Sequence, residues 1–175
     1  VNGAVSKPLT MRLPVGTSYR EAIELAGGAT VEEFVVLDGG PMMGKVVEDL
    51  SLPITKTTNG VIVLPKDHRW VKKLTAPENT ALKFSMICCT CSMCTDICPR
   101  NLLGHSIQPH RTMSRMALAN VLDPSAFTTA FLCCECGLCD YICPLELLPR
   151  EVNVILKRRL GEAGVKNPHR RTDIK

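Results

Sequence analysis

The sequences CCTCSMCTDICP at residues 88–99 and CCECGLCDYICP at residues 133–144 decide how this chain is organised. Together these two runs hold all 10 cysteines of the 175-residue chain. Each run opens with two adjacent cysteines, continues with cysteines separated by short spacers, and ends in a Cys-Pro pair. The first cysteines of the two runs, Cys88 and Cys133, are 45 positions apart. The sequence therefore predicts two related cysteine-rich loops formed by an internal repeat.

The pattern C-x2-C-x2-C-x3-C-P within each run is typical of [4Fe–4S] binding in bacterial two-cluster ferredoxins. A short loop can wrap three thiolates around one face of a cubane, whereas the fourth cysteine ligates the other cluster in such proteins. We therefore expect two [4Fe–4S] clusters with crossed ligation. The first is expected to bind Cys88, Cys91, Cys94 and Cys143, and the second Cys133, Cys136, Cys139 and Cys98.

Other uses of the cysteines fit the spacing less well. A disulfide framework also needs an even number of cysteines, but these are closely spaced and no signal peptide is visible. Structural zinc uses two C-x2-C pairs, whereas each run here offers three regularly spaced cysteines and a fourth before proline. Cys89 and Cys134 fall outside the pattern and are expected to be small buried hydrophobic residues rather than donors near cluster sulfur. Because cysteines satisfy both clusters, His105 and His110 are not expected to bind metal.

Composition and charge argue against two further classes of protein. The formal net charge is +4, but two oxidised clusters of about −2 each would bring the total near zero. Since aromatic residues make up only 4% of the chain, stacking on single strands is not expected, and we predict no nucleic-acid partner. No stretch approaches the about 18 apolar residues of a membrane helix, so no membrane span is expected. The cysteine content without secretory features indicates a reducing compartment.

The first 64 residues are expected to form a small mixed α/β module. Strands are predicted at residues 11–15, 33–37 and 60–64 from their apolar and β-branched residues. Ser18 and Glu21 have the spacing of a capping box that opens a helix over residues 19–26, and Gly27-Gly28 would end it. The glycine-rich segment 39–44 lacks the order of a phosphate-binding loop and is interpreted as a tight turn.

The rest of the chain is expected to be mainly helical, which makes the predicted fold class α+β. We predict a linker at 65–80, a helical two-cluster domain at 81–160 and a basic tail at 161–175. Thr75 and Glu78 could cap a helix leading into the first run. Further helices are expected over 110–119, after Asp123-Pro124, and from Pro149 to about 160, where Gly161 would end the last one.

Short motifs in the first module carry a family resemblance. The sequences VNGAVSKP at 1–8, PVGT at 14–17 and AGG at 26–28 resemble the soluble-ligand-binding β-grasp domain. The sequences GPMMG at 40–44 and KTTNG at 56–60, followed by the two cysteine runs, resemble the C subunits of Rnf electron-transport complexes and PduS-type cobalamin reductases. The resemblance covers essentially the whole chain.

This resemblance implies an electron relay within an NADH oxidoreductase. In these families NADH reduces FMN in a domain N-terminal to the β-grasp module. We expect that flavin domain to be missing from this chain. The segment from Cys98 to His105, continuing to His110, is closer to the PduS type. That type implies electron delivery to cobalamin in a bacterial microcompartment, with a cobalamin adenosyltransferase or a shell protein as partner.

Two alternative functions remain open at this level. One is the C component of a membrane-associated Rnf NADH:ferredoxin oxidoreductase, with membrane Rnf subunits as partners, at the cytoplasmic face of the membrane. The other is a docking module whose clusters only stabilise the fold. The chain begins with Val1, so we expect a fragment of a longer protein, and no residue of it is expected to be catalytic.

Overall fold

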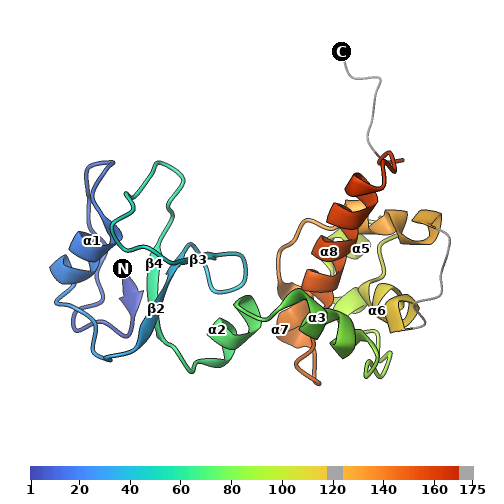
Figure 1. Cartoon of the computed structure of the whole chain (residues 1–175), viewed down its shortest axis with the longest axis horizontal. Coiled ribbons are helices and arrows are strands. Elements are labelled where there is room, and N and C mark those ends of the chain that lie inside the picture. Colours follow the sequence, from blue (N-terminus) through green and yellow to red (C-terminus); the bar gives the residue numbers. More distant parts are fainter. Residues whose placement is uncertain (118–123, 170–175) are drawn as a thin grey trace, which may run out of the picture. The chain divides into compact units, whose positions relative to one another are not determined.

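The computed structural model describes residues 1–117 and 124–169, which divide into two compact units, Val1–Ala76 and Pro77–Lys175. The first unit contains a mixed sheet and helices, and the second contains helices in its described part, so the α+β fold class is confirmed (Figure 1). The expected linker segment 65–80 contains a helix of its own, α2 (Arg69–Leu74), and the division of the sequence between the two units falls after Ala76.

The first unit is built on a four-stranded sheet in the order β1-β4-β2-β3. Strand β4 (Val61–Pro65) pairs in parallel with β1 (Asn2–Gly3) and antiparallel with β2 (Phe34–Asp38). Strand β3 (Lys45–Val47) pairs antiparallel with the other side of β2. The strands expected at 33–37 and 60–64 therefore exist within one residue of their predicted bounds, while β1 and β3 were not predicted.

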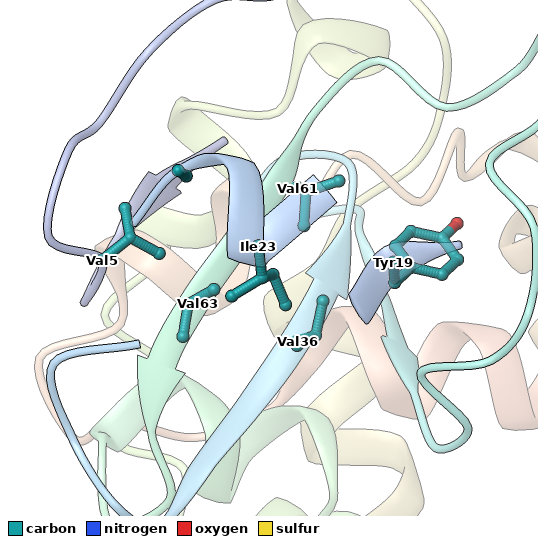
Figure 2. Close-up of a cluster of buried hydrophobic side chains, with 7 residues drawn as sticks. Val5, Tyr19, Ile23, Val36, Val61 and Val63 are labelled. Atoms are coloured by element: carbon teal, nitrogen blue, oxygen red, sulfur yellow. The ribbon is translucent and has the colours of Figure 1, made fainter. Parts of the chain in front are cut away.

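Helix α1 (Tyr19–Leu25) begins as the sequence predicts. The Ser18 side chain accepts from the Glu21 backbone, and the Glu21 carboxylate accepts from the Ser18 backbone N–H at 2.8 Å. The helix buries Tyr19, Ala22 and Ile23. Figure 2 shows Tyr19 and Ile23 beside the sheet, in a core that contains Val5, Tyr19, Ile23, Ala26, Val36, Val61 and Val63.

Two other predictions for this unit have opposite outcomes. The strand expected at 11–15 is wrong: the chain turns at residues 14–17, where the Thr17 side chain donates to the Pro14 carbonyl at 2.9 Å. Proline at that position also cannot donate to a ladder. The segment 39–44 is a turn, as expected. A side chain at Gly44 would place its Cβ 2.4 Å from the Gly40 carbonyl oxygen, so the turn is too tight for any other residue there.

The second unit is a set of helices packed around α8. Its elements are α3 (Glu78–Ser85), α4 (Met93–Asp96), α5 (Pro99–Leu102), α6 (Pro109–Ala117), η1 (Pro124–Leu132), α7 (Leu138–Ile142) and α8 (Pro149–Glu162). Helix α8 contacts α3, α6, α7 and η1, and it contributes Val152, Ile155, Leu156 and Leu160 to the buried core. The short helices α4 and α7, one from each cysteine run, also contact each other.

The helix ends in and before this unit correct two predictions. Thr75 does not open α3; its hydroxyl donates to the Val71 carbonyl and caps the end of α2. Gly161 does not end α8, which continues to Glu162; the residue in the left-handed region is Gly164, with φ +72°. Glycine at the position after a helix cap relieves the strain of that conformation. The described part of the helix expected over 110–119 runs from Pro109 to Ala117, and the cap expected at Asp123 lies outside the described residues.

Candidate iron-sulfur centres

The two cysteine runs adopt the same backbone conformation. Thr90 and Ser92 in the first run have φ of +53° and +65°, and Glu135 and Gly137, at the same positions of the second, have +59° and +79°. Such values are uncommon for residues other than glycine. Their repetition at matched positions indicates that the spacing of the thiols depends on these two reversals. Ser92 and Gly137 also stand immediately before α4 and α7.

The fourth cysteine of each run leaves its own loop in an extended conformation. Cys98 has φ −66° and ψ 117°, and Cys143 has φ −63° and ψ 117°. Pro99 then begins α5, whereas Pro144 is followed by a turn. A proline at the first helical position loses no hydrogen bond, because its N–H would have no partner within the helix.

The thiols lie around two cavities, each containing residues from both runs. The first cavity is lined by the thiol-bearing residues Cys88, Cys89, Cys91, Cys94 and Cys143. The second is lined by Cys98, Cys133, Cys134, Cys136 and Cys139. The structure thus brings together the two crossed sets of four that the sequence analysis names, and it adds one further cysteine to each. Iron ligation by these sets stays a prediction.

The donors at both cavities match the chemistry of an iron-sulfur cluster. Thiolates are the protein ligands of [4Fe–4S] clusters, four to each. In the described part of the chain no three His, Cys, Asp or Glu side chains are grouped closely enough to hold a single metal ion. Four ligands of a cubane bind four separate irons, so their sulfur atoms surround the cavity rather than converge on one point.

Burial makes five of the cysteines poor acids in the absence of iron. Burial raises the pKa of the thiols of Cys88, Cys133 and Cys136, and it raises that of Cys94 to about 12. Burial, followed by the neighbouring Asp140 carboxylate, also raises the pKa of Cys139. Because iron binds the thiolate, these groups release protons when a cluster forms, and the positive charge of iron compensates for their burial.

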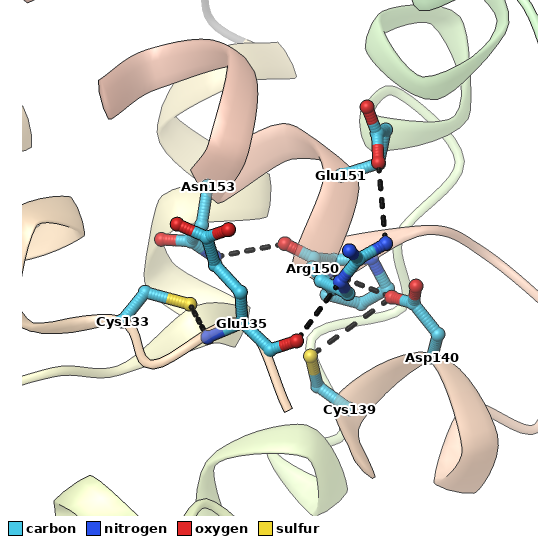
Figure 3. Close-up of polar contacts among 8 residues, drawn as sticks. Cys133, Glu135, Cys139, Asp140, Arg150, Glu151 and Asn153 are labelled. Atoms are coloured by element: carbon cyan, nitrogen blue, oxygen red, sulfur yellow. Dashed lines mark hydrogen bonds and ion pairs between the residues drawn. The ribbon is translucent and has the colours of Figure 1, made fainter. Parts of the chain in front are cut away.

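Basic side chains from α8 hold the loop of the second run, and Figure 3 shows one of them, Arg150. The Arg150 guanidinium donates to the Glu135 carbonyl oxygen at 3.1 Å. The Lys157 ammonium donates to the Cys133 carbonyl oxygen and to the Glu135 carboxylate, both at 2.6 Å. The Glu135 backbone N–H in turn donates to the Cys133 sulfur at 3.4 Å. These contacts fix the loop through its backbone and place two cations beside it.

Asp140 connects the second run to the start of α8. Its carboxylate accepts from the Arg150 backbone N–H at 2.7 Å and is buried next to Cys139 (Figure 3). The residue that precedes α8, Leu148, makes no side-chain capping bond. Asp140 therefore supplies the cap from a distant part of the sequence, where the partial positive charge of the helix N-terminus favours a carboxylate.

A neutral version of this contact occurs in the first run. Thr95, which follows Cys94 as Asp140 follows Cys139, accepts from the His110 backbone N–H at 3.4 Å at the start of α6. The Thr95 hydroxyl also lies 2.6 Å from His110 Nδ1. Burial, and then the charge of Arg111, lowers the pKa of His110 despite the opposite influence of Asp96. His110 lines the first cavity, whereas His105 is exposed.

Sequence reasoning missed these supporting residues and was wrong about the extra cysteines. Asp140, Arg150 and Lys157 were not predicted to support the site. A signal was present for Arg150: the pairs Pro109-His110 and Pro149-Arg150, which open α6 and α8, each place a basic residue directly after proline. Cys89 and Cys134 were expected to be buried, but both are exposed. Each follows a partly buried cysteine at the rim of its cavity, where the side chain reaches solvent.

Comparison with known proteins gives matches in both halves of the chain. The family model of the 4Fe-4S dicluster domain matches residues 87–148, and that of the SLBB domain matches residues 1–46. The dicluster match contains both cysteine runs and confirms the expectation of two [4Fe–4S] clusters. Among residues 1–117 and 124–169, no helix has both the length and the apolar character needed to cross a bilayer.

Two groups of curated relatives match the chain. Cobalamin reductases PduS from Citrobacter freundii and Salmonella typhimurium are 41% and 42% identical over 91% of this chain and 36% of their own length. The C component of a proton-translocating ferredoxin:NAD(+) oxidoreductase complex from Clostridium ljungdahlii is 31% identical over 57% of this chain and 20% of its own length. The chain thus spans about a third of the length of the cobalamin reductases that it matches.

Proposed function

We propose that this chain is the electron-transfer part of a flavin- and iron-sulfur-dependent NADH oxidoreductase. Its matches to the SLBB and 4Fe-4S dicluster domain models support this, as does its similarity to PduS cobalamin reductases and to C subunits of ion-translocating oxidoreductases. The observation that carries the proposal is the pair of cavities, each with four thiols in the two-cluster pattern. They lie in one compact helical unit, as a two-step electron path requires.

The proposed ligands are the two crossed sets. Cys88, Cys91, Cys94 and Cys143 bind the first cluster, and Cys98, Cys133, Cys136 and Cys139 bind the second. Two cavities lined by these thiols support the assignment, as does the contact between α4 and α7. When bound, each cluster supplies a site that gains or loses one electron at a time. The residues of the chain exclude water from the buried thiols and hold both loops in place.

The whole protein requires a further component to use NADH. Hydride transfer moves two electrons together, so a group that accepts two and releases one at a time must precede the clusters. We propose that this group is FMN, bound with NADH in a flavin domain N-terminal to this chain. The greater length of the matched relatives supports a larger protein or complex.

The acceptor that we propose is cobalamin, as the name of the PduS relatives states for those proteins. The match to them has higher identity and covers more of the chain than the match to C subunits, which supports the PduS type. The proposed location is a bacterial microcompartment, and the proposed partners are a cobalamin adenosyltransferase or a shell protein. Shell-protein genes beside the gene would support this assignment, whereas genes for membrane subunits would support the Rnf alternative.

The electron-relay function is tested with the purified chain alone. After anaerobic reconstitution without added flavin, we expect dithionite to bleach the visible absorbance of the clusters and NADH to leave it unchanged. An EPR-monitored redox titration should show reversible reduction of both clusters. Clusters that cannot be reduced reversibly would indicate a docking module instead. Bleaching by NADH alone would contradict the proposed need for a separate flavin domain.

A further inference from the structure

Each cluster cavity is lined by one thiol more than a cluster needs. A [4Fe–4S] cluster takes four thiolates, but five cysteines line the first cavity and five line the second. The additional residues are Cys89 and Cys134, which occupy the same position in the two runs. A repeated fifth thiol at both cavities distinguishes these residues from an isolated surface cysteine.

The backbone explains how two adjacent cysteines can line one cavity. Successive side chains of an extended chain point in opposite directions. Here the chain reverses directly after the adjacent pair, at Thr90 with φ +53° and at Glu135 with φ +59°. Cys88 and Cys89 both line the first cavity, and Cys133 and Cys134 both line the second.

The extra thiols are accessible, unlike most of the others. Cys89 and Cys134 are exposed, whereas Cys88 and Cys133 are partly buried. An exposed free thiol in an electron-transfer protein is open to oxidation. A role at the cavity accounts for a cysteine at both positions, which packing does not, because neither side chain is buried in the core.

We propose that Cys89 and Cys134 are reserve ligands, each able to replace the preceding cysteine at one iron of the adjacent cluster. In the exchange the bond from iron to the Cys88 sulfur breaks and a bond to the Cys89 sulfur forms. Cys89 releases its proton, Cys88 takes one up, and the oxidation state of the cluster is unchanged. The same exchange applies to Cys133 and Cys134. This inference rests on the ligand sets proposed above.

The decisive variant is Cys88→Ala, with Cys91→Ala as the matched control because no cysteine adjoins Cys91 on either side. Iron is measured after anaerobic reconstitution, and exposed thiols are labelled with iodoacetamide and mapped by mass spectrometry. The unaltered chain should hold about eight irons, with Cys89 labelled. Cys88→Ala should also hold about eight, with Cys89 now protected. Cys91→Ala and the double variant Cys88→Ala/Cys89→Ala should each hold about four.

The outcomes separate this inference from the proposed ligand sets. Loss of the first cluster in Cys88→Ala, with Cys89 labelled, would overturn the reserve role while leaving the ligand sets in place. Retention of about eight irons in Cys91→Ala would instead overturn the ligand sets. The EPR signal of the second cluster serves as the folding check in every variant of the first run. Its loss in Cys88→Ala but not in Cys91→Ala also counts against the inference.

The second cavity provides an independent repeat of the experiment. Cys133→Ala should retain about eight irons and protect Cys134, and Cys133→Ala/Cys134→Ala should fall to about four. Cys139→Ala is the matched control. Alanine at Cys89 or Cys134 alone should leave both clusters intact. A loss of iron in either of these single variants would show that the residue is a primary ligand and would overturn the reserve role.

Discussion

The first and second cysteine runs have the same spacing and the same backbone reversals, yet their surroundings differ. Around the second run, Arg150 and Lys157 donate to carbonyl oxygens of the loop. The buried carboxylate of Asp140 lies beside Cys139. Around the first run, the matching contact is made by a hydroxyl, Thr95, with a histidine. The loop of the first run is also more open: Cys91 is exposed, whereas its counterpart Cys136 is partly buried.

This difference shows which parts of a cluster site the repeat determines. The repeated residues set the positions of the thiols. The charges around them come from Asp140, at the position that Thr95 occupies in the first run, and from Arg150 and Lys157 on α8, which lies outside the repeated loops. Because the potential of an iron-sulfur cluster depends on charge, hydrogen bonds and exposure, two loops with one pattern can hold clusters of different potential. Each of the following predictions tests this comparison.

The largest expected effect is the loss of a whole cluster, and it tests how the runs share ligands. Cys98→Ala should remove the cluster of the second run and lower iron from about eight to about four per chain. Adding Cys136→Ala should lower the iron no further, because both residues then belong to the cluster already lost. Adding Cys91→Ala should remove nearly all iron. The opposite pattern in the two double variants would show that each run ligates its own cluster.

A moderate effect is expected from the buried carboxylate that distinguishes the second run. Asp140→Asn keeps an oxygen that accepts from the Arg150 N–H but removes a negative charge next to Cys139. The midpoint potential of the second cluster should rise by about 60 mV, equivalent to a tenfold change for one electron. Thr95→Val, the matched change in the first run, removes no charge and should shift the first cluster less. The measurement is an EPR-monitored titration, and an unchanged or lower potential in Asp140→Asn would contradict the expectation.

A smaller shift of opposite sign is expected from Lys157→Met. The change removes a cation beside the second run, so the second cluster should become harder to reduce. The Lys157 side chain is 25% exposed and pairs with Glu135. Screening by solvent should therefore keep the shift in potential below that of Asp140→Asn, on the order of 30 mV. Lys166→Met, which removes the same charge from an exposed position beyond α8, is the control. Equal shifts in the two variants would indicate an effect of net charge only.

The smallest effect is expected from an ion pair at the surface. Glu78 on α3 pairs with Arg158 and Arg159 on α8, and the Arg158 hydrogen bond lowers its pKa. Exposed pairs of this kind contribute little to stability. Glu78→Gln should leave the iron content, both potentials and the unfolding temperature unchanged within error. A clear fall in unfolding temperature would show that surface contacts, and not only Asp140 and the buried core, hold α8 in place.

The sequence by itself determined the features that depend on local pattern. The spacing of the cysteines predicted two clusters, and the capping box of Ser18 and Glu21 predicted where α1 begins. Runs of β-branched residues predicted β2 and β4, since such residues favour strands wherever one face is buried. Each of these signals lies within about a dozen residues, so no knowledge of the rest of the chain was needed.

Only the tertiary structure decided the features that depend on residues far apart in the chain. Asp140 caps α8 across ten positions, Lys157 reaches Cys133 across 24, and each cavity combines cysteines of both runs. Gly164 rather than Gly161 takes the left-handed conformation after α8, a choice that the local sequence, with glycine at both positions, did not decide. Local sequence fixes backbone preferences and ligand chemistry, whereas the charge and exposure around each cluster arise only when distant segments pack together.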